Sequence, residues 1–202
     1  MKDINMSYNK VSIKYLTNKV IQYKASKDWY YNSNKLIKEL YKDNYKTFIY
    51  LLGITSPRNT VKTNTIFTIR AYNEVIHNTH NDIKYGISHK NIYSNILRVK
   101  KHEYNKIRGI KVKSFINSLL LIPGSICLDV WMKRVFNINT HRIKETDRIQ
   151  IYNKINTIAL NLNMESYEVQ ACLWSYAKKE LNTTYRHKEI HDFSYYLKQI
   201  RP

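Results

Sequence analysis

Glycine and proline are scarce in this sequence. The chain has 4 glycines and 3 prolines among 202 residues. Because these residues form most hairpin turns and long loops, their scarcity argues against a β-rich fold and predicts an all-α one. The apolar pattern predicts helices over residues 45–52, 61–76 and 149–162, and a last strong helix from residue 166 that is followed by a basic tail.

Cysteine is also scarce. The chain has 2, Cys127 and Cys172, and both stand among apolar residues without the spacing of metal ligands. Two such residues cannot by themselves build a zinc site or an iron–sulfur cluster, and free cysteines are typical of a reducing compartment. The 7 histidines show no metal-binding spacing either. We therefore expect no metal and no cofactor.

Long apolar runs are absent. No stretch of 18 apolar residues occurs, and the N-terminal residues 1–5 lead into no apolar segment of a signal peptide. The sequence therefore predicts a protein that is neither secreted nor membrane-spanning, and we expect it in the cytoplasm.

Acidic residues are few in comparison with basic ones. The chain has 34 lysines and arginines against 15 acids, which gives a formal charge of +19. A protein this basic most often binds phosphate groups, which indicates nucleic acid, with an anionic membrane surface as the weaker alternative. An AT-rich genome would enrich lysine and asparagine together, but it would not explain the shortage of acids.

The densest basic run lies between residues 90 and 113. It is either the solvated face of a helix or a track for phosphates. Glu103 is its one acid, and its basic residues are Lys90, Arg98, Lys100, Lys101, Lys106, Arg108, Lys111 and Lys113.

The stretch 109–136 follows directly and contains a single carboxylate, Asp129. Two helix-prone runs flank the turn residues 122–125, Ile-Pro-Gly-Ser. After the turn, apolar residues at 128, 131, 132, 135 and 136 have the spacing of a buried helix face. Asp129 falls at the start of that helix, where a negative charge meets the positive end. It is the candidate catalytic group, and the alternative is an acid that only caps the helix.

Three stretches in this order resemble the helix-hairpin-helix DNA glycosylase superfamily. Residues 51–64, LLGITSPRNTVKTN, are similar to a block in which a helix ends in a polar turn that reaches the DNA. Residues 109–116, GIKVKSFI, are similar to the G-x-x-x-K-A-x-x-I helix that precedes the family's hairpin. Residues 128–135, LDVWMKRV, resemble V-D-T-H-V-x-R-V, whose aspartate is catalytic. The resemblance spans residues 45–136.

The chain departs from that family in several ways. Its hairpin is reduced to a remnant turn at residues 121–125, the iron–sulfur cysteines are absent, and Trp131 replaces the histidine of the aspartate block. The lysine that forms a Schiff base has no counterpart, so no lyase activity is expected. The V-D-x-W-M block and the V-Q-A-x-x-W pattern of residues 169–174 resemble short phage-type members, and a related phage group hypermodifies thymine-derived bases.

The resemblance implies two interlocked helical lobes with a cleft between them. Residues 45–128 would form a central lobe, and residues 1–44 with 129–202 a second one. Asp129 would face the cleft and act on a base extruded from double-stranded DNA. The implied DNA contacts are Arg58, Asn59, Lys111, Lys113, Lys133 and Arg134. The implied pocket residues are Trp131, Trp174 and Tyr176, and for the last two a core position is the alternative.

Three functions are open at this point. The first is a DNA glycosylase-like enzyme that hydrolyses the N-glycosidic bond of a modified or damaged base. The second is a phage DNA-hypermodification transferase on the same scaffold, and the third is a DNA-binding protein without catalysis. The retained aspartate favours the first, whereas the missing lysine and hairpin argue against ordinary repair. In each case the resemblance implies a bacterial or phage-infected cell.

Overall fold

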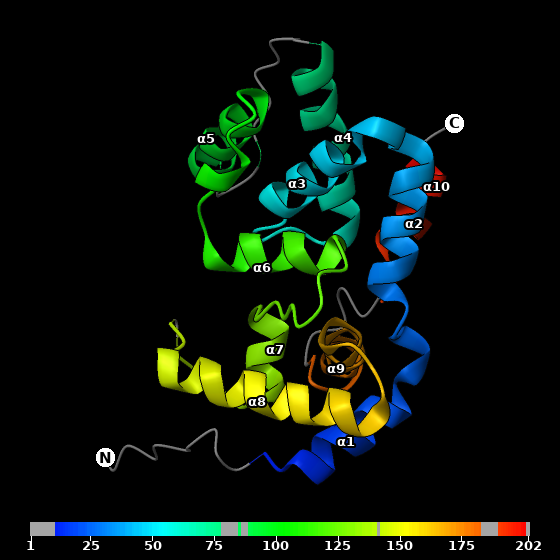
Figure 1. The fold of residues 1–202 in the computed structure, drawn as a ribbon, viewed down its shortest axis with the longest axis vertical. Coiled ribbons are helices and arrows are strands. Elements are labelled where there is room, and N and C mark those ends of the chain that lie inside the picture. The colour runs from blue at the N-terminus through cyan, green and yellow to red at the C-terminus, as the bar shows by residue number, and fades with distance from the viewer. Residues whose placement is uncertain (1–10, 78–84, 86–88, 141, 183–189, 201–202) are drawn as a thin grey trace. The chain divides into compact units, whose positions relative to one another are not determined.

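The structure is a computed structural model that describes residues 11–77, 85, 89–140, 142–182 and 190–200. In these residues the only regular elements are helices (Figure 1), which confirms the all-α prediction. Of the expected basic tail, residues 183–189 lie outside the described residues. None of the described helices is long and apolar enough to cross a membrane.

The chain divides into two compact units. Unit 1 is Met1–Trp29 with Pro123–Ile190, and unit 2 is Tyr30–Ile122 with His191–Pro202. These boundaries differ from the expected division into 45–128 and 1–44 with 129–202. The C-terminal segment joins unit 2 because its helix packs on a helix of that unit, and because Phe193 N donates a hydrogen bond to Ser33 Oγ at 3.2 Å.

Unit 1 is built around one helix, α9. Its elements are α1 (Ile13–Gln22), the 3-10 turn η2 (Lys24–Ser26), α7 (Val130–Val135), α8 (Glu145–Leu162) and α9 (Ser166–Glu180). Helix α9 packs on α1, α7 and α8, so small and apolar residues occupy most of its surface. A capping box formed by Glu165 and Glu168 begins it. The expected helices at 149–162 and from 166 are therefore present.

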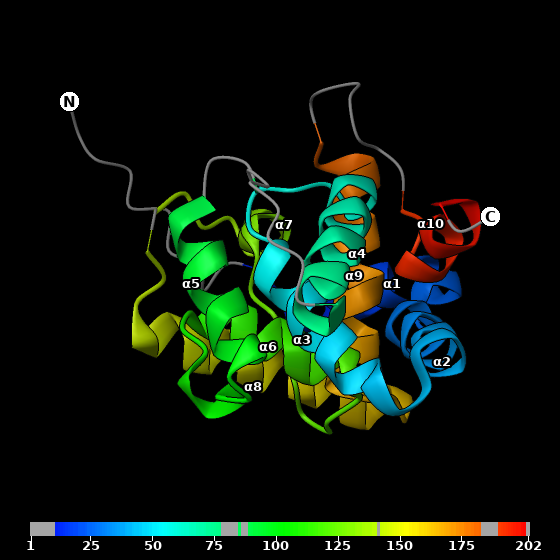
Figure 2. The same cartoon turned by 90° about the horizontal axis from the view of Figure 1, so that it is seen from above.

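Unit 2 has an apolar helix, α3, at its centre. Its elements are α2 (Trp29–Tyr41, whose first residue belongs to unit 1), η3 (Lys42–Asn44), α3 (Tyr45–Thr55), α4 (Val61–His77), α5 (His89–Lys100), η5 (Tyr104–Lys106), α6 (Ile110–Leu119) and α10 (Phe193–Ile200). Helices α4, α5 and α6 pack on α3 (Figure 2), and its residues 51–55 are all buried. Helix α10 is an addition to the helices expected from the sequence.

One glycine allows the close approach of α3 and α6. A Cβ built at Gly53 would overlap the side chain of Ile116. At the end of α3, Asn59 Nδ2 donates to Thr55 O at 2.7 Å, and Thr60 Oγ1 accepts from Thr63 N at 3.1 Å at the start of α4. The polar turn of residues 56–60 therefore ends one helix and caps the next.

Candidate functional site around Asp129

Asp129 is the N-cap residue of α7. Its Oδ1 accepts hydrogen bonds from Trp131 N at 3.0 Å and from Met132 N at 2.9 Å. An N-cap aspartate satisfies first-turn N–H groups that have no partner within the helix, and its charge meets the positive end of the helix. The capping role suggested by the sequence is therefore present, and it occupies one carboxylate oxygen.

The other oxygen of Asp129 has a partner from a different helix. Trp174 Nε1, on α9, donates a hydrogen bond to Oδ2 at 3.2 Å. Capping does not require this contact, because the N–H groups of α7 are served by Oδ1 alone. N–H donors from two helices thus hold a half-buried carboxylate in one orientation.

The segment that leads into α7 is aligned with one face of α9. Gln170, Trp174 and Lys178 are four residues apart and so lie on the same face. Gln170 Oε1 accepts from Cys127 N at 2.8 Å, Trp174 reaches Asp129, and Lys178 reaches Trp131. These three contacts join alternate residues of the segment 127–131 to successive turns of one face of α9.

Two cations lie over the indole of Trp131. The guanidinium carbon of Arg134 is 4.3 Å from the ring centre, and Lys178 Nζ is 5.0 Å from it. Lys178 Nζ is also 5.5 Å from the ring centre of Trp174, which packs against Trp29 at 5.8 Å. Cations are attracted to the negative face of an aromatic ring, most strongly to tryptophan. We call Asp129, Trp131, Arg134, Trp174 and Lys178 the Asp129 cluster.

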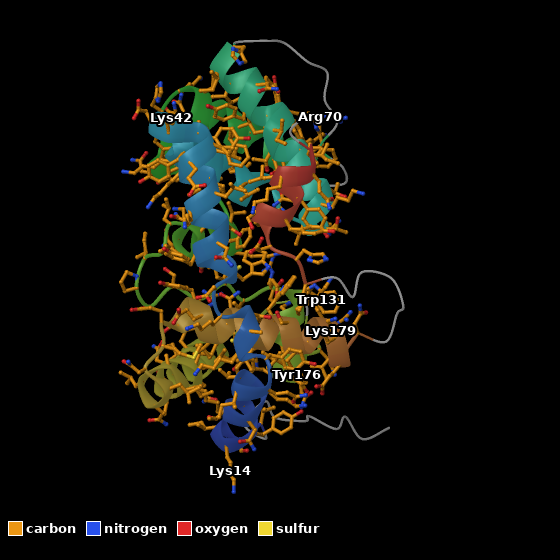
Figure 3. All side chains as sticks on the ribbon, turned by 90° about the vertical axis from the view of Figure 1, so that its right-hand side faces the viewer. Lys14, Lys42, Arg70, Trp131, Tyr176 and Lys179 are labelled. Atoms are coloured by element: carbon orange, nitrogen blue, oxygen red, sulfur yellow. The ribbon has the colours of Figure 1, made fainter. Side chains whose placement is uncertain are left out.

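The cations of this cluster differ in exposure. Lys178 is 7% exposed, whereas Arg134 is exposed. Within the part of the chain that the structure describes, Arg134 forms no ion pair with an acid. Trp131 lies beside the C-terminal part of α9, where Lys178 contacts it (Figure 3). The cluster therefore combines a fixed carboxylate with one exposed and one buried cation.

The structure places Tyr176 on another face of α9. It follows Trp174 by two residues, which is about 200° around a helix. Tyr176 is 3% exposed (Figure 3). Its hydroxyl is 2.6 Å from that of Tyr15, and Lys19 Nζ is 4.7 Å from its ring centre. Tyr176 thus has the core position given as the alternative, and it does not join Trp131 and Trp174.

A second carboxylate, Glu180, holds α1 against α9. It accepts hydrogen bonds from Lys19 Nζ at 2.7 Å, Gln22 Nε2 at 3.1 Å and Tyr23 Oη at 3.0 Å. Burial raises the pKa of Glu180, but the hydrogen bonds from Lys19 and Tyr23 outweigh it and leave that pKa below its usual value. Burial and the bond to Glu180 raise the pKa of Tyr23 to about 12.

The remaining predicted contact in unit 1, Lys133, has a local partner. Its Nζ donates to Thr140 O at 3.1 Å, so this side chain ties α7 to the segment after it. Both cysteines of unit 1 are buried free thiols, and burial raises the pKa of Cys172 to about 12. That thiol therefore stays protonated at neutral pH.

The other predicted DNA contacts belong to unit 2. Arg58 is exposed and has a φ of 64°, in the left-handed region that residues other than glycine rarely adopt. The side chain of Asn59 is bonded to the end of α3, as described above. Lys111 and Lys113 are exposed near the start of α6. Within unit 1, the structure brings together four of the predicted residues, Asp129, Trp131, Arg134 and Trp174.

One buried amide, that of Asn95, links two parts of the basic run of residues 90–113 in unit 2. Asn95, 5% exposed, accepts at Oδ1 from Arg98 Nη1 at 2.6 Å and from Arg108 N at 3.0 Å. Its Nδ2 donates to Arg108 O at 3.2 Å. Helix α5 and the segment that leads into α6 are thereby held together.

A family of unknown function, DUF7178, matches residues 4–181. The chain belongs to this family. The matched region includes all five residues of the Asp129 cluster and ends one residue after α9. No curated protein and no solved structure matches the chain.

Lys178 is the member of the cluster that sequence reasoning missed. Gln170, Trp174 and Lys178 follow one another at intervals of four residues, which places them on one helix face. This spacing was the signal in the sequence that could have linked Lys178 to Trp174. It could not be used, because nothing local shows that this face meets residues 127–131. In the described ranges, no group of three or more His, Cys, Asp or Glu side chains has the arrangement of a metal site.

Proposed function

We propose that this protein binds DNA and hydrolyses the N-glycosidic bond of an extruded modified or damaged base, with Asp129 as the catalytic carboxylate. The observation that supports this proposal best is the hydrogen bond from Trp174 to Asp129 Oδ2. It joins the carboxylate that the helix-hairpin-helix resemblance singles out to a cluster of tryptophans and cations. A helix cap alone has no need of such surroundings.

The chemistry requires a fixed negative charge near the sugar. Hydrolysis breaks the bond between C1′ and the base and forms a bond between C1′ and the oxygen of water. As the base departs with the electron pair, positive charge grows on the sugar, and a carboxylate held close to it stabilises that charge. The attacking water loses a proton and the departing base takes one up. Asp129 fits the electrostatic part of this reaction, because its N–H donors prevent it from turning away.

The charge of the protein suits a DNA substrate. A base must leave the stack before its glycosidic bond can be attacked, which costs a few kcal/mol. Contacts between basic side chains and phosphates repay that energy and dominate the affinity of such proteins. With a formal charge of +19, the chain has ample basic residues for these contacts.

A second candidate is a DNA-binding protein without catalysis. One observation favours it: Asp129 Oδ1 already serves two backbone N–H groups of α7. An aspartate that caps a helix and orients a tryptophan would have a purely structural role.

The two candidates are separated by incubating the protein with duplexes that carry single modified or damaged bases and then cleaving abasic sites with alkali. Asparagine is as good an N-cap as aspartate, so Asp129→Asn removes the charge and keeps α7 capped. We expect this variant to bind DNA normally and to form abasic sites at least about 100-fold more slowly than the wild type.

Asp192→Asn is the matched control. Asp192 is half-buried before α10 and accepts from Tyr195 N at 3.1 Å, as an N-cap does, and it belongs to unit 2, outside the Asp129 cluster. This control should excise bases at the wild-type rate. Wild-type protein that binds every duplex and releases no base from any of them would contradict excision. Mass spectrometry of the same DNA would then distinguish base modification from binding alone.

A further inference from the structure

Two cations lie over the indole of Trp131, so its expected role as a pocket residue that stacks a base has to be reconsidered. Arg134 and Lys178 come from two helices, α7 and α9, and both lie over this ring. A base can stack on an aromatic ring only where the face is open. With two cations over it, Trp131 is better suited to position positive charge than to stack a base.

We propose that Arg134 and Lys178 form a phosphate-binding subsite beside Asp129, and that it takes a phosphodiester of the DNA strand that carries the target base. The phosphate contact stands on the geometry of the two cations. Its meaning for catalysis rests on the proposed function of Asp129. A phosphodiester is the ligand whose negative charge and oxygen acceptors best match these two cations.

The geometry of Arg134 leaves it able to bind. A guanidinium stacked on an indole keeps its N–H groups at the edge, where they can grip two oxygens of one phosphate. Arg134 is exposed, and it makes no ion pair with an acid in the described part of the chain. Among the described residues, an incoming phosphate therefore meets no carboxylate that is paired with Arg134.

Lys178 adds a charge that solvent screens poorly. The residue is 7% exposed and lies between the rings of Trp131 and Trp174. Charges act over a longer range in such surroundings than in water. The buried ammonium thus reinforces the attraction of a phosphate toward the exposed guanidinium.

The arrangement of charges in the cluster matches a nucleotide that is losing its base. Such a nucleotide has a permanent negative charge on its phosphate and a growing positive charge on its sugar. The cluster offers the complement of both, with cations over Trp131 and a carboxylate at Asp129 that is joined to them through Trp174. A free carboxylate ligand would satisfy the cations and leave Asp129 without a counterpart.

The first test measures how DNA affinity depends on salt. Each phosphate contact that is lost reduces the slope of log K against log salt by about 0.9 on duplex DNA. We expect Arg134→Gln and Lys178→Met each to lower that slope by about one for a duplex with a central mismatch. Lys179→Gln is the matched control, because Lys179 is the exposed neighbour of Lys178 on the same helix. It should keep the wild-type slope.

The second test uses tryptophan emission as a local signal. All 3 tryptophans of the chain, Trp29, Trp131 and Trp174, belong to unit 1, and each contacts or belongs to the cluster. Binding of the same duplex should change the emission of the wild type and of Lys179→Gln. The change should be lost in Arg134→Gln, which alters an exposed residue and so should fold even if Lys178→Met does not.

Several outcomes would overturn the subsite. One is a wild-type slope in Arg134→Gln, another is an equal loss in Lys179→Gln, and a third is saturating binding without any change of emission. Its failure is distinguishable from that of the proposed function. If the wild type forms abasic sites but Arg134→Gln keeps the wild-type slope, excision is supported and the subsite is contradicted. A reduced slope in a protein that releases no base would leave the subsite standing without excision.

Discussion

The starts of α7 and α10 are alike in sequence and different in surroundings. Asp129 and Asp192 both precede a helix, and both accept a hydrogen bond from the backbone N–H three residues on. Asp192 Oδ1 also accepts from the nearby Ser194 Oγ at 2.6 Å, whereas Asp129 Oδ2 accepts from Trp174, which is 45 residues away. The comparison separates what a cap needs from what the Asp129 cluster adds to it.

Replacing each aspartate by alanine should show the difference between the two helix starts most clearly, as unequal losses of stability. Loss of an N-cap costs about 0.5–2 kcal/mol, and a half-buried indole N–H left without its acceptor costs about 1–3 kcal/mol more. Asp129→Ala should therefore destabilise unit 1 by about 1.5–5 kcal/mol, whereas Asp192→Ala should destabilise unit 2 by the cap alone. Urea unfolding followed by tryptophan emission reports on unit 1, and far-ultraviolet circular dichroism reports on both units. Equal losses at the two positions would contradict the comparison.

Removing only the N–H group of Trp174 that donates to Asp129 Oδ2 should sharpen the comparison between the two aspartates. Trp174→Phe keeps a ring against Trp29 and deletes the N–H group that contacts Asp129. A hydrogen bond to a charged group contributes about 1.5–3 kcal/mol, so we expect a loss of stability near the lower end of this range. DNA affinity should change little, while the rate of base release should fall. Trp29→Phe is the control, and a rate as low as that of Trp174→Phe would assign the effect to packing.

A third carboxylate, Glu180, should show the smallest effect. Its pKa in the folded protein lies below its usual value. It therefore contributes stability above the usual pKa of a glutamate, and that contribution is lost as the pH falls through the folded value. Because the side chain of Glu180 is still 37% exposed and solvent screens its charge, the effect should be below about 1 kcal/mol. Unfolding of the wild type and of Glu180→Gln between pH 7 and pH 3 should converge at the acidic end. A constant difference over this range would contradict the stabilising role given to the charge of Glu180.

Some of the fold was predictable because its causes are local. The helices at 149–162 and from 166 follow from apolar spacing, and α4 begins after Thr60 because a threonine oxygen reaches an N–H group three residues on. Asp129 was expected at the start of a helix for the same reason. Helix α10 was missed, since eight residues that contain tyrosines and polar groups form a weak pattern until they pack on α4.

The site was less predictable, because its contacts join distant parts of the chain. Trp174 and Tyr176 stand in the same run of sequence, yet one reaches Asp129 and the other reaches Tyr15. Lys178 was not singled out, and Lys133 is bonded to Thr140 O within unit 1. Nothing within a few residues of these side chains indicates which helix each one faces.

The sequence by itself determined that the chain is helical, strongly basic and able to place an aspartate at the first turn of a short helix. These properties depend on composition and on bonds that span three or four residues. Only the tertiary structure decided that α9 runs beside residues 127–131, so that Trp174 and Lys178 meet Asp129 and Trp131. The physical reason is that packing between helices depends on which faces fit together, and that choice is made by the whole core of unit 1.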